Sequence, residues 1–152
     1  MVYKFRTEPL ASTAADSPYI GGLTEVKWGD CAVSSEPMGS FGYSGCRALV
    51  FQNGKHMGLS HIWKTDTPPM IRHYVKGMLG HADPADVMAF ISAGLRPECA
   101  VESCREFEIP VVGTNNDEEN PYWYRDVIVV PSTREVFIYS EKGKETFVFP
   151  EK

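Results

Sequence analysis

The sequence predicts an α+β fold in which a central mixed or antiparallel β-sheet or sandwich is flanked by two helices. Seven or eight segments have strand patterns and only two have helical patterns. The strands cluster early and late in the chain instead of alternating with helices. A length of 152 residues with 43% apolar and 12% aromatic residues suffices for one core. We therefore expect a flexible N-terminal arm over 1–22 and a single domain over 23–152.

The first elements follow from local patterns. Residues 1–20 are rich in Ser, Ala, Thr and Pro without periodicity, which is typical of a loosely held arm. Residues 24–28 alternate as a strand, and 31–34 continue the pattern after a break at Gly29-Asp30.

A β-hairpin is predicted next, because Asn53-Gly54 lies between the apolar runs 46–52 and 56–62. Asn-Gly suits a type I′ turn, in which both central residues have positive φ. With these two residues as the loop, continued pairing places Cys46 directly opposite His61. Their side chains would then share one face, with Cβ atoms about 4.5–5.5 Å apart.

The remaining elements complete the fold. A helix is expected after Thr67, with Pro68 at its first position and Gly80 at its end. The apolar run 87–91 suits a strand covered on both faces. The later segments are a helix over 97–107, a strand over 109–112, an acidic loop over 115–120, and a meander over 124–130, 135–139 and 146–149.

Composition excludes several classes of protein. The net charge of −5 and the absence of a basic stripe argue against a nucleic-acid partner. No apolar run approaches the roughly 20 residues that span a bilayer, and no export signal is visible. We expect a soluble protein without a membrane partner, cytoplasmic or translocated into a host cell without a cleavable signal peptide. No cofactor is implied.

The chain has four cysteines and no Cys-x-x-Cys or His-x3-His spacing. Without an export signal, free thiols are favoured over disulfides. We therefore predict no metal, although a zinc site made by Cys31, Cys46 and His61 stays open as an alternative.

A cysteine beside a histidine suits nucleophilic catalysis, because a nearby imidazolium lowers the pKa of a thiol. Ser40, six residues before Cys46, is a candidate to orient the imidazole or to bind the substrate. The structural alternative is that Cys46 is a buried apolar filler and His61 a polar residue at a strand end.

The residues around Cys46 resemble the CheD family of chemoreceptor glutamine deamidases and related bacterial deamidase toxins. The resemblance rests on Gly29 to Ser34, Pro37, Ser40, Ser44-Gly45-Cys46 and Gly58-Leu59-Ser60-His61, in that order and at similar spacing. Ser-Gly-Cys is closer to the toxin branch, so a bacterial effector or toxin stays open.

The resemblance implies hydrolysis of a glutamine side chain on a protein partner. Cys46 would attack the carboxamide and His61 would act as general acid and base. Ser40 would orient the imidazole or bind the amide. Ser44 and Gly45 would border the oxyanion site, and Trp63 would line the substrate groove. The alternatives are a transglutaminase with the same pair and a non-catalytic binding module.

Overall fold

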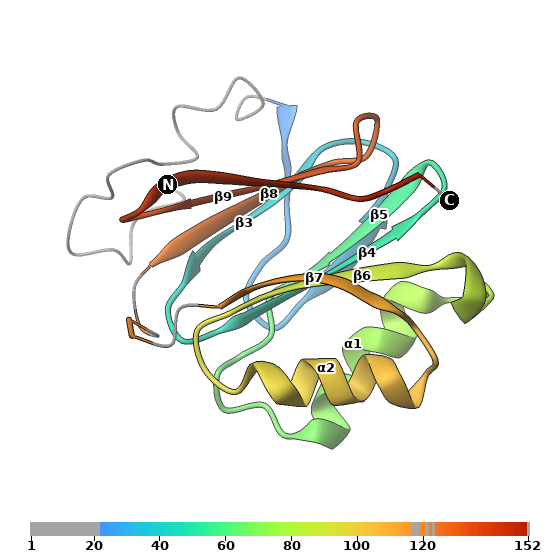
Figure 1. Ribbon diagram of the computed structural model, residues 1–152, viewed down its shortest axis with the longest axis horizontal. Coiled ribbons are helices and arrows are strands. Elements are labelled where there is room, and N and C mark those ends of the chain that lie inside the picture. The colour runs from blue at the N-terminus through green and yellow to red at the C-terminus, as the bar shows by residue number, and fades with distance from the viewer. Residues whose placement is uncertain (1–21, 117–118, 121, 123, 152) are drawn as a thin grey trace.

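In the described part of the chain, ten strands form two five-stranded sheets, and two α-helices cover one of them (Figure 1). The computed structural model describes residues 22–116, 119–120, 122 and 124–151, so the predicted arm lies almost wholly outside the described residues. The predicted α+β class, with a sheet flanked by two helices, is confirmed.

The first sheet has the order β1-β3-β8-β9-β10 and the second the order β2-β5-β4-β6-β7. Most neighbours are antiparallel, and only β1 with β3 and β6 with β7 are parallel. The strands of the first sheet are β1 (Thr24–Glu25), β3 (Met38–Tyr43), β8 (Arg125–Val130), β9 (Glu135–Ser140) and β10 (Gly143–Val148). Those of the second are β2 (Cys31–Ser34), β5 (His56–Ser60), β4 (Arg47–Asn53), β6 (Met88–Ala93) and β7 (Val111–Asn116).

The helices lie where sequence patterns placed them. Helix α1 spans Pro68–Leu79, with Thr67 as N-cap and Gly80 as C-cap, and α2 spans Pro97–Glu106. A short 3-10 helix, η3 (Pro84–Asp86), precedes β6. Proline at the start of each helix loses no hydrogen bond, because the first helical N–H groups have no partner inside the helix.

Strand β6 is covered on both faces, as its continuous apolar sequence predicts. Met88 and Phe90 pack into a core between the two sheets, and Ala89 and Ile91 pack into a second core under the helices. The same division holds along β4, where residue 50 faces the other sheet and residues 49 and 51 face the helices. The second sheet is therefore the middle layer of the molecule.

Strand β3 was not expected. Residues 38–43 contain two glycines and a serine and follow Pro37, so their sequence has no strand pattern. In the structure they form a six-residue strand that pairs with β1 on one side and β8 on the other. Pairing with two neighbours overrides the weak strand propensity of glycine.

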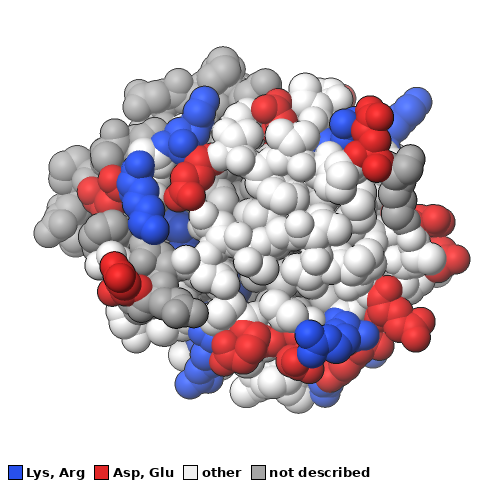
Figure 2. All heavy atoms as spheres, viewed as in Figure 1, with Lys and Arg blue, Asp and Glu red and all other residues white. Residues whose placement is uncertain are grey.

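No helix in the described ranges is long and apolar enough to cross a membrane. The face shown in Figure 2 carries charges of both signs at its margins and uncharged residues in its middle. This face therefore has no single-sign basic stripe of the kind that binds phosphate backbones. The absence of a nucleic-acid partner stays a prediction.

Candidate functional site

The hairpin forms, but its register differs from the predicted one. Asn53 pairs with His56 and Val50 with Leu59, so the two-residue loop is Gly54-Lys55. Gly54 has φ +59°, and neither Asn53 nor Lys55 has a positive φ. Positive φ at the first loop residue alone is the type II′ pattern, which needs glycine at that position. The predicted type I′ turn at Asn53-Gly54 is therefore wrong.

This register moves Cys46 and His61 apart by one pair. Arg47 and Ile62 are directly opposed and exchange two backbone hydrogen bonds, of 3.0 and 2.9 Å. Cys46 precedes Arg47 and His61 precedes Ile62, so they are diagonal neighbours instead of opposed ones. Diagonal neighbours share one face, with Cα atoms about 7–8 Å apart. The pair still faces one space, between the sheets.

Ser40 touches His61, which is the contact predicted for an orienting hydroxyl. The Ser40 Oγ lies 2.8 Å from His61 Nδ1 and 2.6 Å from the carbonyl oxygen of Val26. That carbonyl only accepts, so the Ser40 hydroxyl donates its proton to Val26 and accepts from Nδ1–H. This network assigns the neutral imidazole with its proton on Nδ1 and a free electron pair on Nε2.

A β-bulge in β3 gives His61 its second neighbour. Ser40 pairs with Val127 and Tyr43 with Arg125, so β3 has one extra residue between these pairs. Gly42 has φ +76° there, which suits a bulge that begins with glycine. The extra residue turns Tyr43 to the same face as Ser40. The Tyr43 ring stacks on the imidazole at 3.8 Å, with 5° between the planes.

Burial makes both reactive groups neutral at rest. The pKa of His61 is lowered to about 3 by burial and by the charge of Arg125. Burial raises the pKa of the Cys46 thiol, against the opposing effects of backbone hydrogen bonds with Lys64 and Ser44 and of two positive charges. The expected thiolate beside an imidazolium is therefore wrong for the resting protein. His61 Nε2 has no hydrogen-bond partner among the residues described.

The other predicted site residues surround Cys46. A Cβ at Gly45 would lie 3.2 to 3.3 Å from the side chains of Tyr122, Leu95 and Lys64, so glycine lets these three close around the loop. The Ser44 hydroxyl donates to the carbonyl of Tyr122 at 2.8 Å. This bond ties the loop before Cys46 to the segment before β8.

Trp63 follows Ile62, which pairs with Arg47, so Trp63 lies beside Cys46 at the end of this strand pair. Its ring makes an edge contact with Trp28 at 5.1 Å, and Trp28 lies 5.9 Å from the ring of His61. Both tryptophans are more than a third exposed. An aromatic surface thus borders the histidine, and the role of Trp63 in a substrate groove stays a prediction.

Two residues of this site were missed by sequence reasoning, Tyr43 and Arg125. The Arg125 guanidinium crosses between the sheets and donates to the carbonyl of Cys46 at 2.9 Å. Gly42 inside an otherwise strand-like segment was a usable signal for the bulge that places Tyr43. No local signal exists for Arg125, because it lies 79 residues from Cys46.

The zinc alternative fails on topology. Cys31 packs with the helices on one face of the second sheet, whereas Cys46 belongs to the core on its other face. Within the described part of the chain, no group of three His, Cys, Asp or Glu residues gathers around a common point. All four cysteines are free thiols.

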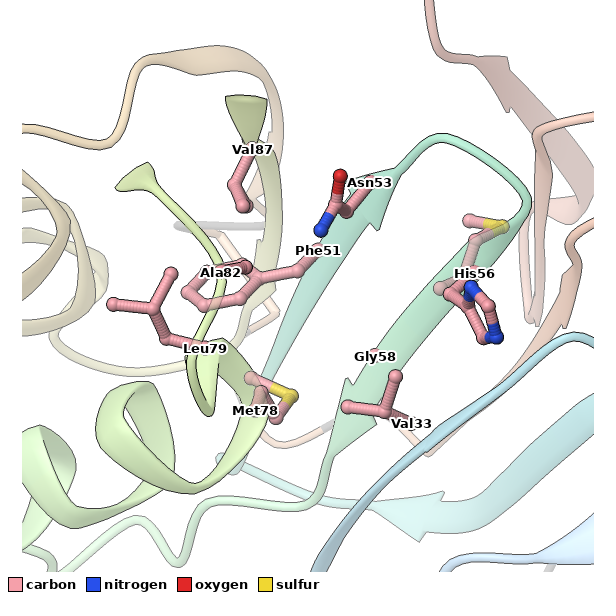
Figure 3. Close-up of a pocket in the computed structure, with 10 residues that line it drawn as sticks. Val33, Phe51, Asn53, His56, Gly58, Met78, Leu79, Ala82 and Val87 are labelled. Carbon is pink, nitrogen blue, oxygen red and sulfur yellow. The ribbon is translucent and has the colours of Figure 1, made fainter. Parts of the chain in front are cut away.

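A cavity of about 120 Å³ lies away from this site, beside the hairpin turn (Figure 3). Phe51, Met78, Leu79 and Val87 provide much of its apolar wall, and His56 stands at its edge near Val33. A second, open hollow follows α2 and the start of β7. Neither includes Cys46, His61 or Ser40.

No family model and no curated protein matches the chain. Among solved structures, the chain is similar to the Neisseria meningitidis protein NMB0706, which is described by the family model DUF152. The TM-score is 0.47 at 11% sequence identity, and the match covers 66% of each chain. The present chain thus spans just under two thirds of that protein. We assign no activity from this likeness.

The resemblance to the CheD family is corrected by the comparisons: no family model matches the chain, and the similar structure carries the description DUF152. The functions that depended on this resemblance are therefore not retained. They are glutamine deamidation, a related toxin or effector, a transglutaminase, and a non-catalytic binding module on that fold. The direct Cys46–His61 pairing expected from the hairpin is absent as well. The expected protein partner stays a prediction.

Proposed function

We propose that the protein is a cysteine-dependent acyl-transfer enzyme, with Cys46 as nucleophile and His61 as general base and acid. The proposed reaction cleaves a bond between an acyl carbon and oxygen, nitrogen or sulfur. It does not specify a protein glutamine as the substrate. One observation carries the proposal. The Ser40 hydroxyl accepts a hydrogen bond from Nδ1–H of a buried imidazole, and Nε2 is unpaired within the described residues, on the same sheet face as a cysteine.

A buried polar atom without a partner costs about 1–3 kcal/mol. A histidine that only filled the core would be replaced by an apolar residue at less cost. An unpaired Nε2 instead suits a base that waits for a proton. Ser40, held by Val26, does for His61 what the third member of a catalytic triad does, since it fixes the tautomer and the ring orientation.

The proton balance follows from these neutral resting states. As the Cys46 sulfur bonds to the acyl carbon, its proton passes to His61 Nε2. The imidazolium then gives this proton to the leaving group as its bond to carbon breaks. Water attacks the thioester in the second half, with His61 again taking and returning a proton.

The oxyanion needs a hydrogen-bond donor close to the sulfur. Among the influences on the pKa of the Cys46 thiol, a backbone hydrogen bond with Lys64 lowers it and so favours the thiolate. We assign the Lys64 amide to the oxyanion site, next to the predicted position at Gly45. Such a donor is typically worth about 10²- to 10³-fold in kcat.

The test uses acyl donors with good leaving groups, a nitrophenyl ester and a small thioester. Wild type should accumulate an acyl group on Cys46, seen by peptide mass spectrometry, and release product. Cys46→Ala should do neither. His61→Gln should lose about 10²- to 10⁴-fold in rate. Ser40→Ala should lower kcat more than it changes KM.

Cys99→Ser is the matched control, because Cys99 is a half-buried free thiol that belongs to α2 and not to this site. It should keep the wild-type rate. Acylation that persists in Cys46→Ala, or equal acylation of Cys99 and Cys46, would refute the proposal.

A further inference from the structure

Arg125 joins the two sheets at the candidate site. It is the first residue of β8 and pairs with Tyr43 of β3, so the two side chains share the face that looks toward the second sheet. Its exposed fraction is 3%. From there Nη2 reaches the carbonyl oxygen of Cys46 at 2.9 Å. A charged side chain from one sheet thus holds the backbone of the nucleophile on the other.

The same carbonyl accepts a second hydrogen bond, from the backbone N–H of Gly94 at 3.2 Å. Gly94 follows β6, the neighbour of β4. The peptide of Cys46 is therefore fixed from two directions, by its own sheet and by Arg125. This arrangement positions the sulfur without any contact between Arg125 and a substrate.

The charge of Arg125 acts on three groups of the site. It lowers the pKa values of Cys46, of His61 and of Tyr43. The other ionisable groups around the thiol are Lys64, whose charge also favours the thiolate, and Asp126, whose charge acts on Tyr43. Arg125 is the buried positive charge among them.

Arg47 shows that a buried arginine close to Cys46 in sequence need not lower the pKa of the thiol. It is fully buried and adjacent to Cys46, but its guanidinium donates to the carbonyls of Trp63 and Asp66 at 2.7 and 3.0 Å. Those contacts lie on the helix side of the sheet. Arg125, in contrast, brings its guanidinium to the face that carries the thiol and the imidazole.

We propose that Arg125 is a positioning residue of the Cys46 site, which holds the Cys46 carbonyl and favours negative charge on the sulfur over positive charge on His61. This inference rests on the proposed function, because a positioning role requires that Cys46 is the nucleophile. Acyl transfer develops negative charge on the sulfur and the acyl oxygen, and a fixed buried cation stabilises such charge more strongly than water does.

The experiment measures the pH dependence of iodoacetamide alkylation at Cys46, site by site, in wild type, Arg125→Lys and Arg125→Met. Loss of the charge should raise the midpoint for Cys46 by about one pH unit or more, since a nearby opposite charge shifts a pKa by about 1–3 units. Arg125→Lys should stay closer to wild type. Cys99 serves as the internal reference.

Arg134→Met is the matched control, because Arg134 is a partly buried arginine that donates to the carbonyl of Phe149, outside the site. It should leave the Cys46 midpoint unchanged. Should Arg125→Met fail to fold, Arg125→Gln supplies a neutral side chain that can still donate to the carbonyl. A folded neutral variant with the wild-type midpoint would overturn the proposal.

Alkylation needs no turnover, so the two proposals fail separately. A shifted midpoint without acyl transfer in wild type would refute the enzymatic function and leave the electrostatic role of Arg125 standing. Normal acyl transfer with an unshifted midpoint would do the reverse.

Discussion

At the scale of single residues, the site depends on how burial treats a thiol and an imidazole. Both groups lose hydration between the sheets, and for each the neutral form gains. Reaction therefore begins with a neutral pair and needs the proton to move as the new bond forms. Slow alkylation of Cys46 at neutral pH is expected in the absence of substrate.

His61 should make the protein sensitive to acid. Its pKa is about 3 in the folded protein and about 6.5 in the unfolded chain. Above pH 6.5 the proton makes no difference. As pH falls from 6.5 toward 3, the unfolded chain binds a proton that the folded protein refuses, so stability falls by up to about 1.4 kcal/mol per pH unit.

The measurement is urea unfolding of wild type and His61→Gln between pH 7 and pH 4. As pH falls, the free energy of unfolding of wild type should decrease more than that of His61→Gln. Other acidic groups are common to both proteins and cancel. A difference that stays constant over this range would contradict a buried neutral histidine.

At the scale of elements, the hairpin turn decides the register of the site. Gly54 has φ +59° and no atom within 4 Å of a Cβ built on it, so an added side chain meets strain but no clash. Gly54→Ala should therefore cost about 1–2 kcal/mol of stability. Lys55→Ala should change stability by less than about 0.5 kcal/mol.

Gly54→Asn tests the cause, since asparagine tolerates positive φ better than alanine. It should cost less than Gly54→Ala in thermal or urea unfolding. Equal costs for the two variants would mean that backbone strain is not the reason glycine is needed at this turn.

At the scale of the whole molecule, the two sheets meet at the edge formed by β7 and β10. A Cβ at Gly113 of β7 would lie 2.5 Å from Cε1 of Phe147 of β10. Phe147 cannot easily retreat, because it stacks on Phe90 at 4.3 Å and contacts Phe149 at 5.1 Å. Close approach of the sheets thus depends on a missing side chain.

Gly113→Ala should destabilise the protein by about 1–3 kcal/mol, the usual cost of overpacking. Thr114→Ala, at an exposed position of the same strand, is the control and should have a small effect. Phe147→Leu should cost less in the Gly113→Ala background than in wild type, because the smaller side chain relieves the contact. Additive costs in urea unfolding would show that the two residues do not interact.

The sequence by itself determined the α+β class, both helices, the caps of α1, the doubly covered β6 and the existence of the hairpin. These features depend on periodicity, on proline and glycine at element ends and on apolar runs, which are local properties. It also singled out Ser40 as a candidate to orient His61 or to bind the substrate, and the structure places Ser40 Oγ 2.8 Å from Nδ1.

Only the tertiary structure decided the register of the hairpin, the strand at β3 and the presence of Arg125 at the site. A two-residue loop has nearly equal alternatives one residue apart, and packing of the strand faces selects between them. β3 exists because neighbours from distant parts of the chain pair with it on both sides. Arg125 reaches Cys46 because the sheets stack, and no local pattern encodes that contact.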